Sequence, residues 1–202
     1  MAASLSTVPT HGFGADKKLE PGSRQKASRV SRPEPPKILI VGNGPSAASR
    51  DWGEYIDSFD EVIRFNYYRL NDWQEKVGSR TTIWSKAENF PDSPLPRGVS
   101  LMRISPVGGG MKFRSTGVCC VERSVSGLRW PSSGVCIANH FIKQGITPVI
   151  IGLDAYGEGP RNYWSDEPCQ EDDPHSSEEE SNWLFEMASA GLIHLLEETQ
   201  GA

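Results

Sequence analysis

The sequence predicts an α/β domain with a doubly wound, mostly parallel sheet. Ile38-Leu-Ile-Val41 is a continuous apolar run that ends in Gly42, the pattern of a strand buried on both faces. A second buried strand, 147–151, follows a helical segment at 134–143. Alternating strands and helices with short connections are typical of this class. The 202 residues leave room for one core, so we expect a single Rossmann-like domain.

The first half of the chain continues this pattern. After the first strand we expect a short helical stretch over 51–58, and further strands over 61–65, 81–84 and 99–104. Between 106 and 130 the pattern dissolves into Gly, Ser and Arg, so we expect a loop or a poorly defined helix there.

The second half supplies two helices. Apolar residues of 134–143 lie close to one helical face, and Gly145 is placed to end that helix. Gly152 closes the strand at 147–151. A long acidic loop then leads to a last helix, expected from 177 to 198.

The charge is unevenly distributed. Residues 1–36 are rich in Ser, Pro, Gly and charge without apolar periodicity, so we expect a disordered basic tail or linker before a folded domain at 37–202. The whole chain has a net charge of −5. A basic arm on an acidic body does not indicate nucleic-acid binding by the fold.

The chain as written has no membrane or secretory signal. No stretch approaches the roughly 18–20 consecutive apolar residues of a membrane span, and the start lacks the apolar core of a signal peptide. We therefore expect a soluble, cytoplasmic chain. The four cysteines lack metal-type spacing and indicate reduced thiols; they are Cys119, Cys120, Cys136 and Cys169.

A glycine-rich segment, Gly42-Asn-Gly-Pro-Ser46, follows the first strand. Ligands in open α/β sheets bind beyond the carboxyl ends of the strands, so these glycines would let a ligand approach the backbone, and Asn43 would offer an amide to a ribose or phosphate. The segment is neither a dinucleotide fingerprint nor a Walker loop. A tight strand-to-helix turn explains the same residues equally well.

Pro131-Ser-Ser-Gly134 stands at the start of the second helical segment. The N–H groups at a helix start attract anions, and Ser132 or Ser133 adds a hydroxyl group. A helix N-cap is the ordinary alternative for such a serine. Both explanations can hold together.

These segments together resemble the sialyltransferases, which move sialic acid from CMP-sialic acid to a glycan hydroxyl. The run 56–66, with its Asp-Ser, Asp, Val and Arg-x-Asn, is similar to the large sialylmotif of the eukaryotic glycosyltransferase family 29, and 76–82 resembles its sequel. Gly42–Ser46 resembles the bacterial family 42 more closely. Pro131–Gly134 is similar to the opening of the small sialylmotif. The resemblance implies a sialyltransferase-like variant of the Rossmann-like fold.

The resemblance also implies a set of residues that bind the nucleotide-sugar donor. These residues are Asn43, Gly44, Ser46, Asn66, Ser132, Ser133 and Gly134. From the residues alone, Asn66 could instead be a strand cap, and Arg64 could be a surface partner of Asp60 or Glu61.

Tyr156 and Tyr163 are candidate catalytic residues. Tyr156 follows a run similar to the bacterial Gly-Ile-Asp-Phe-Tyr, and Asn162-Tyr163-Trp164 stands where the eukaryotic family has His-Tyr-Trp. Phenol hydroxyls can stabilise a departing phosphate without a metal, whereas plain packing is the alternative. Asn162 departs from the family pattern.

His175 and Glu180 match the His-x-x-x-x-Glu spacing of the very small sialylmotif. A neutral imidazole can take the proton of an attacking hydroxyl. Residues five apart point about 140° apart on a regular helix, so the two can meet only if His175 precedes the helix. Glu178 or Glu179 could hold the ring instead, and a solvated histidine in an acidic loop is the alternative.

The acidic run 166–180 contains no Lys or Arg. A metal site would need these carboxylates to converge, whereas such a run is usually a solvated face. We therefore expect no metal and no other cofactor.

The expected function is protein glycosylation by a metal-independent, inverting transfer of sialic acid. The resemblance makes His175 the base, places Tyr156 and Tyr163 at the leaving phosphate, and names a nucleotide-sugar donor and a glycan acceptor as partners. It implies the Golgi lumen if an N-terminal anchor precedes this sequence. The family's disulfide is absent, since Lys37-Ile38 and Gln144-Gly145 stand at those places. A nucleotide-binding module without turnover is the alternative. Asn162 favours it, and so does the short middle of the chain, which would reduce the region that binds the acceptor.

Overall fold

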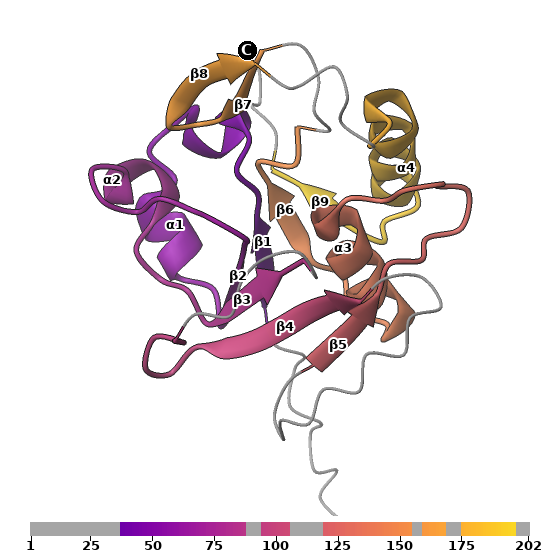
Figure 1. The fold of residues 1–202 in the computed structure, drawn as a ribbon, viewed down its shortest axis with the longest axis horizontal. Helices are drawn as coiled ribbons and strands as arrows, with labels where there is room; N and C mark the ends of the chain where they lie inside the picture. Colours follow the sequence, from indigo (N-terminus) through magenta and orange to yellow (C-terminus); the bar gives the residue numbers. More distant parts are fainter. Residues whose placement is uncertain (1–36, 88–93, 106–118, 155–158, 169–174, 197–202) are drawn as a thin grey trace, which may run out of the picture. The chain divides into compact units, whose positions relative to one another are not determined.

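The computed structural model describes residues 37–87, 94–105, 119–154, 159–168 and 175–196. Seven strands form one sheet in the order β5-β4-β3-β2-β1-β6-β9, and all neighbouring strands in it are parallel. The predicted doubly wound, mostly parallel α/β sheet is therefore confirmed (Figure 1). The predicted tail at 1–36 lies outside the described residues.

The strands of the large sheet are short. They are β1 (Ile38–Val41), β2 (Glu61–Phe65), β3 (Ile83–Lys86), β4 (Ser100–Ser105), β5 (Cys119–Glu122), β6 (Val149–Ile151) and β9 (His194–Leu195). A separate antiparallel hairpin pairs β7 (Pro160–Asn162) with β8 (Ser165–Pro168). The helices are η1, a 3-10 turn (Pro45–Ala48), α1 (Gly53–Asp57), α2 (Gln74–Val77), α3 (Ser133–Lys143) and α4 (Ser177–Ser189).

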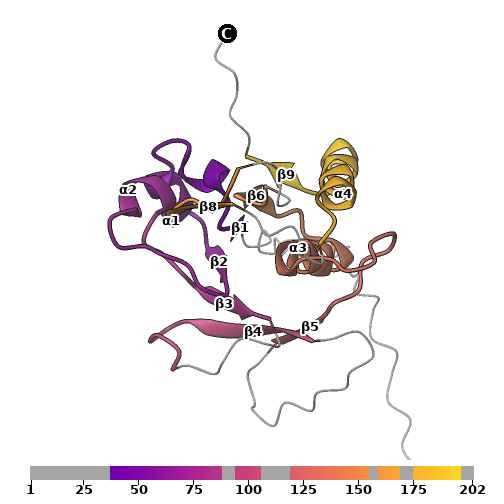
Figure 2. The same ribbon diagram turned by 45° about the horizontal axis from the view of Figure 1, so that its top comes forward.

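Strand β1 is buried on both faces, as its continuous apolar run predicts. Ile38 and Ile40 pack into the hydrophobic cluster that contains α3 and α4 residues. Leu39 and Val41 pack into a second cluster with residues of α1 and α2. Figure 2 shows α1 and α2 on one side of the sheet and α3 and α4 on the other. The chain therefore has three layers with the sheet in the middle.

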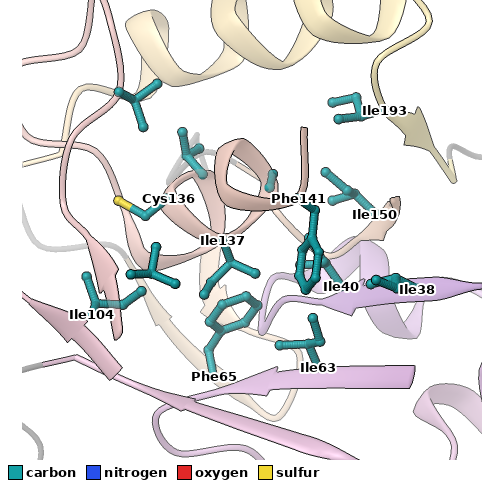
Figure 3. Packing of buried hydrophobic residues seen from close by; sticks show 14 of the residues in the cluster. Ile38, Ile40, Ile63, Phe65, Ile104, Cys136, Ile137, Phe141, Ile150 and Ile193 are labelled. Atoms are coloured by element: carbon teal, nitrogen blue, oxygen red, sulfur yellow. The ribbon is translucent and has the colours of Figure 1, made fainter. Parts of the chain in front are cut away.

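Helix α3 supplies much of the core on its face of the sheet. Ile137 and Phe141 lie over Ile40, Ile63 and Phe65 of the central strands (Figure 3). Ile137, Ile40 and Ile63 are completely buried. The predicted helix at 134–143 is confirmed, and Gly145 follows it with a positive φ of 74°.

Several elements were missed or displaced in the prediction. Strand β3 begins at Ile83, two residues later than expected. Strand β5 lies inside the segment that we expected to be a loop or helix; it is an edge strand in which only Val121 is buried, so its sequence lacks an apolar pattern. The β7–β8 hairpin lies in the expected acidic loop.

The predicted last helix is confirmed at its start, residue 177, but its predicted end at 198 is wrong. Helix α4 ends at Ser189, and Gly191 adopts a φ of 69°. The N–H of Leu192 donates to the carbonyl of Met187 at 2.9 Å, which together with the left-handed glycine forms a Schellman ending. The next residues then form β9, where His194 pairs with Val149 of β6. Gly191 was the signal for this ending.

The described part of the chain contains three cysteines. Cys119 and Cys120 are exposed on β5, and Cys136 is buried in α3. Cys169 lies outside the described residues. Among the helices that the structure describes, none has the length and apolar character that crossing a membrane requires.

Candidate active site

A cavity of about 840 Å³ lies at the carboxyl ends of the central strands. Strand β1 has β2 on one side and β6 on the other, so the order in which the strands are added reverses here. Ligands in open α/β sheets bind at this switch point. The wall comes from the loops after β1, β2 and β6, the start of α3, the β7–β8 hairpin and Glu180.

The loop after β1 is fixed against the loop after β6. The N–H groups of Gly42 and Gly44 donate to the carbonyls of Ile151 and Gly152 at 2.8 and 2.9 Å. A Cβ atom on Gly42 would lie 2.0 Å from the carbonyl oxygen of Gly152, so no other residue fits there. Gly44 lies on the cavity wall, and its predicted contact with the donor stays a prediction.

Ser46 supports the wall from behind. Its N–H donates to Asp154 Oδ2 at 2.9 Å, its hydroxyl donates to Oδ1, and its oxygen accepts from the N–H of Gly152 at 3.2 Å. Ser46 is absent from the described wall, which instead contains Asp154. The predicted contact between Ser46 and a ligand is therefore not supported. Asp154 was missed, although its place directly after Gly152-Leu153 marks the end of a buried strand.

The two asparagines of the wall use opposite ends of their amides in backbone hydrogen bonds. Asn43 Nδ2 donates to the carbonyl of Tyr67 at 2.9 Å, which leaves Oδ1 as an acceptor. Asn66 has a φ of 45°, and its Oδ1 accepts from the N–H of Ala87 at 3.0 Å, which leaves Nδ2 as a donor. The strand-cap explanation of Asn66 therefore holds alongside its predicted position on the wall. Backbone partners fix both amide orientations.

Arg64 is not a surface partner of Asp60 or Glu61. Its side chain is 1% exposed, and its Nε donates to the carbonyl of Arg80 at 3.1 Å. Burial lowers the pKa of Arg64 from its usual value. The guanidinium carbon lies 5.8 Å from the ring centre of Tyr68, a wall residue, so Arg64 supports the wall from inside the core.

Tyr163 packs in the core and does not face the cavity. The residue is 8% exposed, its hydroxyl donates to the carbonyl of Arg69, and its ring meets Trp73 and Trp164 edge-on. Burial raises the pKa of this phenol. The plain-packing alternative describes Tyr163, and its predicted role at a leaving phosphate is not supported. Tyr156 lies outside the described residues.

At the start of α3, the serines can serve both as a helix cap and as part of an anion-binding site. Ser132 is the N-cap, and its hydroxyl oxygen accepts from the N–H of Val135 at 3.5 Å. Ser133 and Gly134 are the first two helical residues, so their N–H groups have no partner within the helix. Ser132, Ser133 and Gly134 all lie on the cavity wall. The helix start can therefore receive an anion there.

Glu180 connects this helix start to His175. It is 3% exposed, and its Oε1 accepts from the N–H of Ser132 at 2.6 Å. The same oxygen lies 3.7 Å from His175 Nδ1. His175 and Glu180 can meet because His175 precedes α4, whose N-cap is Ser176. This fulfils the geometric condition derived from their spacing.

The tautomer of neutral His175 follows from its backbone contact. Nδ1 lies 2.7 Å from the carbonyl oxygen of Trp130, and a carbonyl can only accept, so Nδ1 carries the proton. The basic nitrogen is then Nε2. Glu178 and Glu179 are exposed, and the N–H of Glu179 donates to the N-cap hydroxyl of Ser176. The pairing with Glu180 is the one observed.

Residues 19–93 match the model of Glycosyltransferase family 29 (sialyltransferase). Over 61 residues the chain is 34% identical to the CMP-N-acetylneuraminate-beta-1,4-galactoside alpha-2,3-sialyltransferase of Rattus norvegicus. The aligned segment covers 30% of this chain and 16% of that protein. Over 47 residues it is 43% identical to the Type 2 lactosamine alpha-2,3-sialyltransferase of Homo sapiens, 23% of this chain and 14% of that protein. The chain thus matches about a sixth of the length of these relatives or less.

The fold is similar over a longer stretch. A crystal structure of a mammalian sialyltransferase in complex with Gal-beta-1-3GalNAc-ortho-nitrophenol superposes with a TM-score of 0.57 at 19% identity, covering 80% of this chain and 69% of that chain. The predicted sialyltransferase-like variant of the Rossmann-like fold is therefore confirmed. The likeness to bacterial family 42 stays a prediction.

Proposed function

We propose that this chain transfers sialic acid from CMP-sialic acid to a glycan hydroxyl. One observation carries the proposal. The carboxylate of Glu180 touches both the N–H of Ser132, at a helix start on the cavity wall, and the ring of His175. His175 itself is not among the described wall residues, but Glu180, which is, holds this base beside an anion-binding helix start. Transfer from a phosphate-linked sugar to a hydroxyl requires both groups.

The wall supports binding of a nucleotide donor. The N–H groups of Ser133 and Gly134 would receive the phosphate, aided by the dipole of α3. Asn43 offers an acceptor, and Asn66 offers a donor, to the ribose or the base. The Asp154 carboxylate is suited to ribose hydroxyls, the partners that acidic residues hold in other nucleotide sites.

The proposed reaction is a single displacement. The acceptor oxygen bonds to the anomeric carbon while the bond from that carbon to the phosphate oxygen breaks, so the carbon inverts and CMP leaves with the electron pair. His175 Nε2 takes the acceptor proton, and Glu180 stabilises the imidazolium that forms. The amides of α3 and, by resemblance, the hydroxyl of Tyr156 would meet the charge on the leaving phosphate.

Binding and turnover can be tested separately. We expect calorimetric titration to detect CMP and CMP-sialic acid but not GDP or NAD, because the asparagine amides and the Ser-Ser-Gly turn suit cytidine nucleotides. The named relatives act on beta-1,4-galactosides and type 2 lactosamine, so galactoside-terminated glycans are the first acceptors to add. We expect CMP release to accelerate when they are present.

Two results would redirect the proposal. CMP binding without acceptor-dependent CMP release would favour a nucleotide-binding module without turnover. Tight binding of GDP or NAD with no response to CMP would contradict a sialyltransferase altogether.

The proposed transfer should persist in excess EDTA. Helix-start amides, rather than a cation, would meet the leaving phosphate, and the wall carboxylates of Asp154 and Glu180 already accept hydrogen bonds from Ser46 and Ser132. The measurement is CMP release before and after chelation, with Mg²⁺ or Mn²⁺ added back in a parallel sample. Activity that EDTA abolishes and only a divalent cation restores would show that the metal-independent mechanism is wrong.

A further inference from the structure

The β7–β8 hairpin is fixed against the loops that follow β1 and β2. The N–H of Tyr163 in its turn donates to the carbonyl of Asn43 at 2.8 Å, and the Tyr163 hydroxyl donates to the carbonyl of Arg69. Figure 1 shows the hairpin beside η1, just beyond β1. The side chains that the hairpin carries are therefore held at a defined place on the cavity wall.

Two arginines belong to the cavity wall. Arg161 lies in β7, and Arg69 lies in the loop after β2; of the described wall residues, these two alone are cationic. The guanidinium carbon of Arg69 lies 5.9 Å from the ring centre of Trp164 in the hairpin turn. Such stacking orients a guanidinium while its N–H donors at the edge stay able to bind an oxyanion.

The turn of the hairpin that carries Arg161 packs on the face of the sheet opposite to α3. Tyr163, which holds the hairpin, packs in the cluster with Leu39 and Val41. Helix α3 packs in the cluster on the opposite face. The cavity therefore offers hydrogen-bond donors to anions from two sides.

The negative charges of the wall carboxylates are compatible with an anion subsite. Asp154 and Glu180 each accept a hydrogen bond from a backbone amide, so these interactions partly offset their charges. Glu167, in β8, is the remaining acidic residue of the described wall. A donor with two negative groups, a phosphate and a carboxylate, matches a cavity with donors on two sides better than a neutral sugar nucleotide does.

We propose that Arg69 and Arg161 form a second anion subsite, which takes an oxyanion of an acidic sugar nucleotide. The oxyanion is either the phosphate or the carboxylate of the sugar, since both offer oxygens that a guanidinium can bind in the same way. This assignment rests on the proposed function. If the carboxylate is the bound oxyanion, the subsite gives the cavity a basis for selecting an acidic sugar.

The test compares three ligands that differ by one charged group at a time. Cytidine has neither group, CMP adds the phosphate, and CMP-sialic acid adds the carboxylate. Arg69→Gln and Arg161→Gln should leave the Kd of cytidine unchanged and weaken CMP-sialic acid about 10-fold each, the lower end for hydrogen bonds to charged groups. If the binding of CMP weakens by the same factor as that of CMP-sialic acid, the phosphate is the bound oxyanion. If the Kd of CMP is unchanged, the carboxylate is the bound oxyanion.

Matched variants separate the subsite from general charge and folding effects. Arg97→Gln removes the same charge from an exposed position away from the wall and should change no Kd. Arg161→Lys keeps the charge and should recover part of the lost affinity. Glu167→Gln should strengthen CMP-sialic acid binding, since it removes a negative charge from the same hairpin. Thermal unfolding checks that every variant folds.

Two outcomes would overturn the inference in distinguishable ways. Wild-type affinities for CMP and CMP-sialic acid in both Gln variants, or equal weakening of cytidine, would remove the subsite and leave the proposed function in place. Failure of the wild-type protein to bind any of the three ligands would overturn the proposed function and the subsite with it.

Discussion

His175→Ala should lower the turnover of the proposed transfer on the order of 10²–10⁴-fold, the usual effect of losing a proton-transfer group. Nδ1 of this ring is committed to the carbonyl of Trp130, so Nε2 is the nitrogen that accepts a proton. The affinity for the donor should stay nearly unchanged, because the donor contacts come from other elements. Single-turnover CMP release and calorimetry measure the two quantities.

Asn43→Ala provides the contrast to this variant. Its amide would contact the nucleotide in the ground state and in the transition state alike, so its loss should chiefly weaken donor binding. It also removes the hydrogen bond to Tyr67, so a thermal-unfolding control is needed. A small change in turnover for His175→Ala would exclude this histidine as the base and favour the non-catalytic module.

The central fold could be predicted because buried parallel strands leave a local signal. The apolar runs of β1 and β6, each closed by a glycine, identify strands without reference to the rest of the chain. Strand β5 leaves no such signal, since Cys119, Cys120 and Glu122 are exposed at the sheet edge. Strand β9 has only two residues, and it forms because β6 offers an open edge to the chain after Gly191.

The site was only partly predictable from the sequence. Residue type alone does not fix the direction in which a side chain points. The spacing of His175 and Glu180 required only that the histidine precede a helix, and the structure fulfils that condition. The role of Tyr163 could not be read, since a tyrosine in a core and a tyrosine in a cavity look alike in sequence. The contact between Glu180 and Ser132 joins residues 48 positions apart, which no local pattern reports.

Glu180 should affect both stability and turnover, and two substitutions separate these effects. Glu180→Ala leaves the buried N–H of Ser132 without its acceptor, which should cost about 1–3 kcal/mol of unfolding free energy. Glu180→Gln keeps an oxygen that can accept from this N–H, so its unfolding free energy should change by less than about 1 kcal/mol. Urea unfolding of the two variants measures the difference.

Turnover should fall in both variants, because Glu180 acts through His175. The substitution by Gln removes the negative charge 3.7 Å from Nδ1, so the imidazolium formed during transfer loses its stabilising partner. We expect a loss on the order of 10²-fold, the low end for a proton-transfer step. CMP binding should not weaken, because the substitution removes a negative charge from the cavity wall. Wild-type turnover in Glu180→Gln, together with reduced stability in Glu180→Ala, would show that Glu180 only stabilises the start of α3. His175 would then act without an anionic partner.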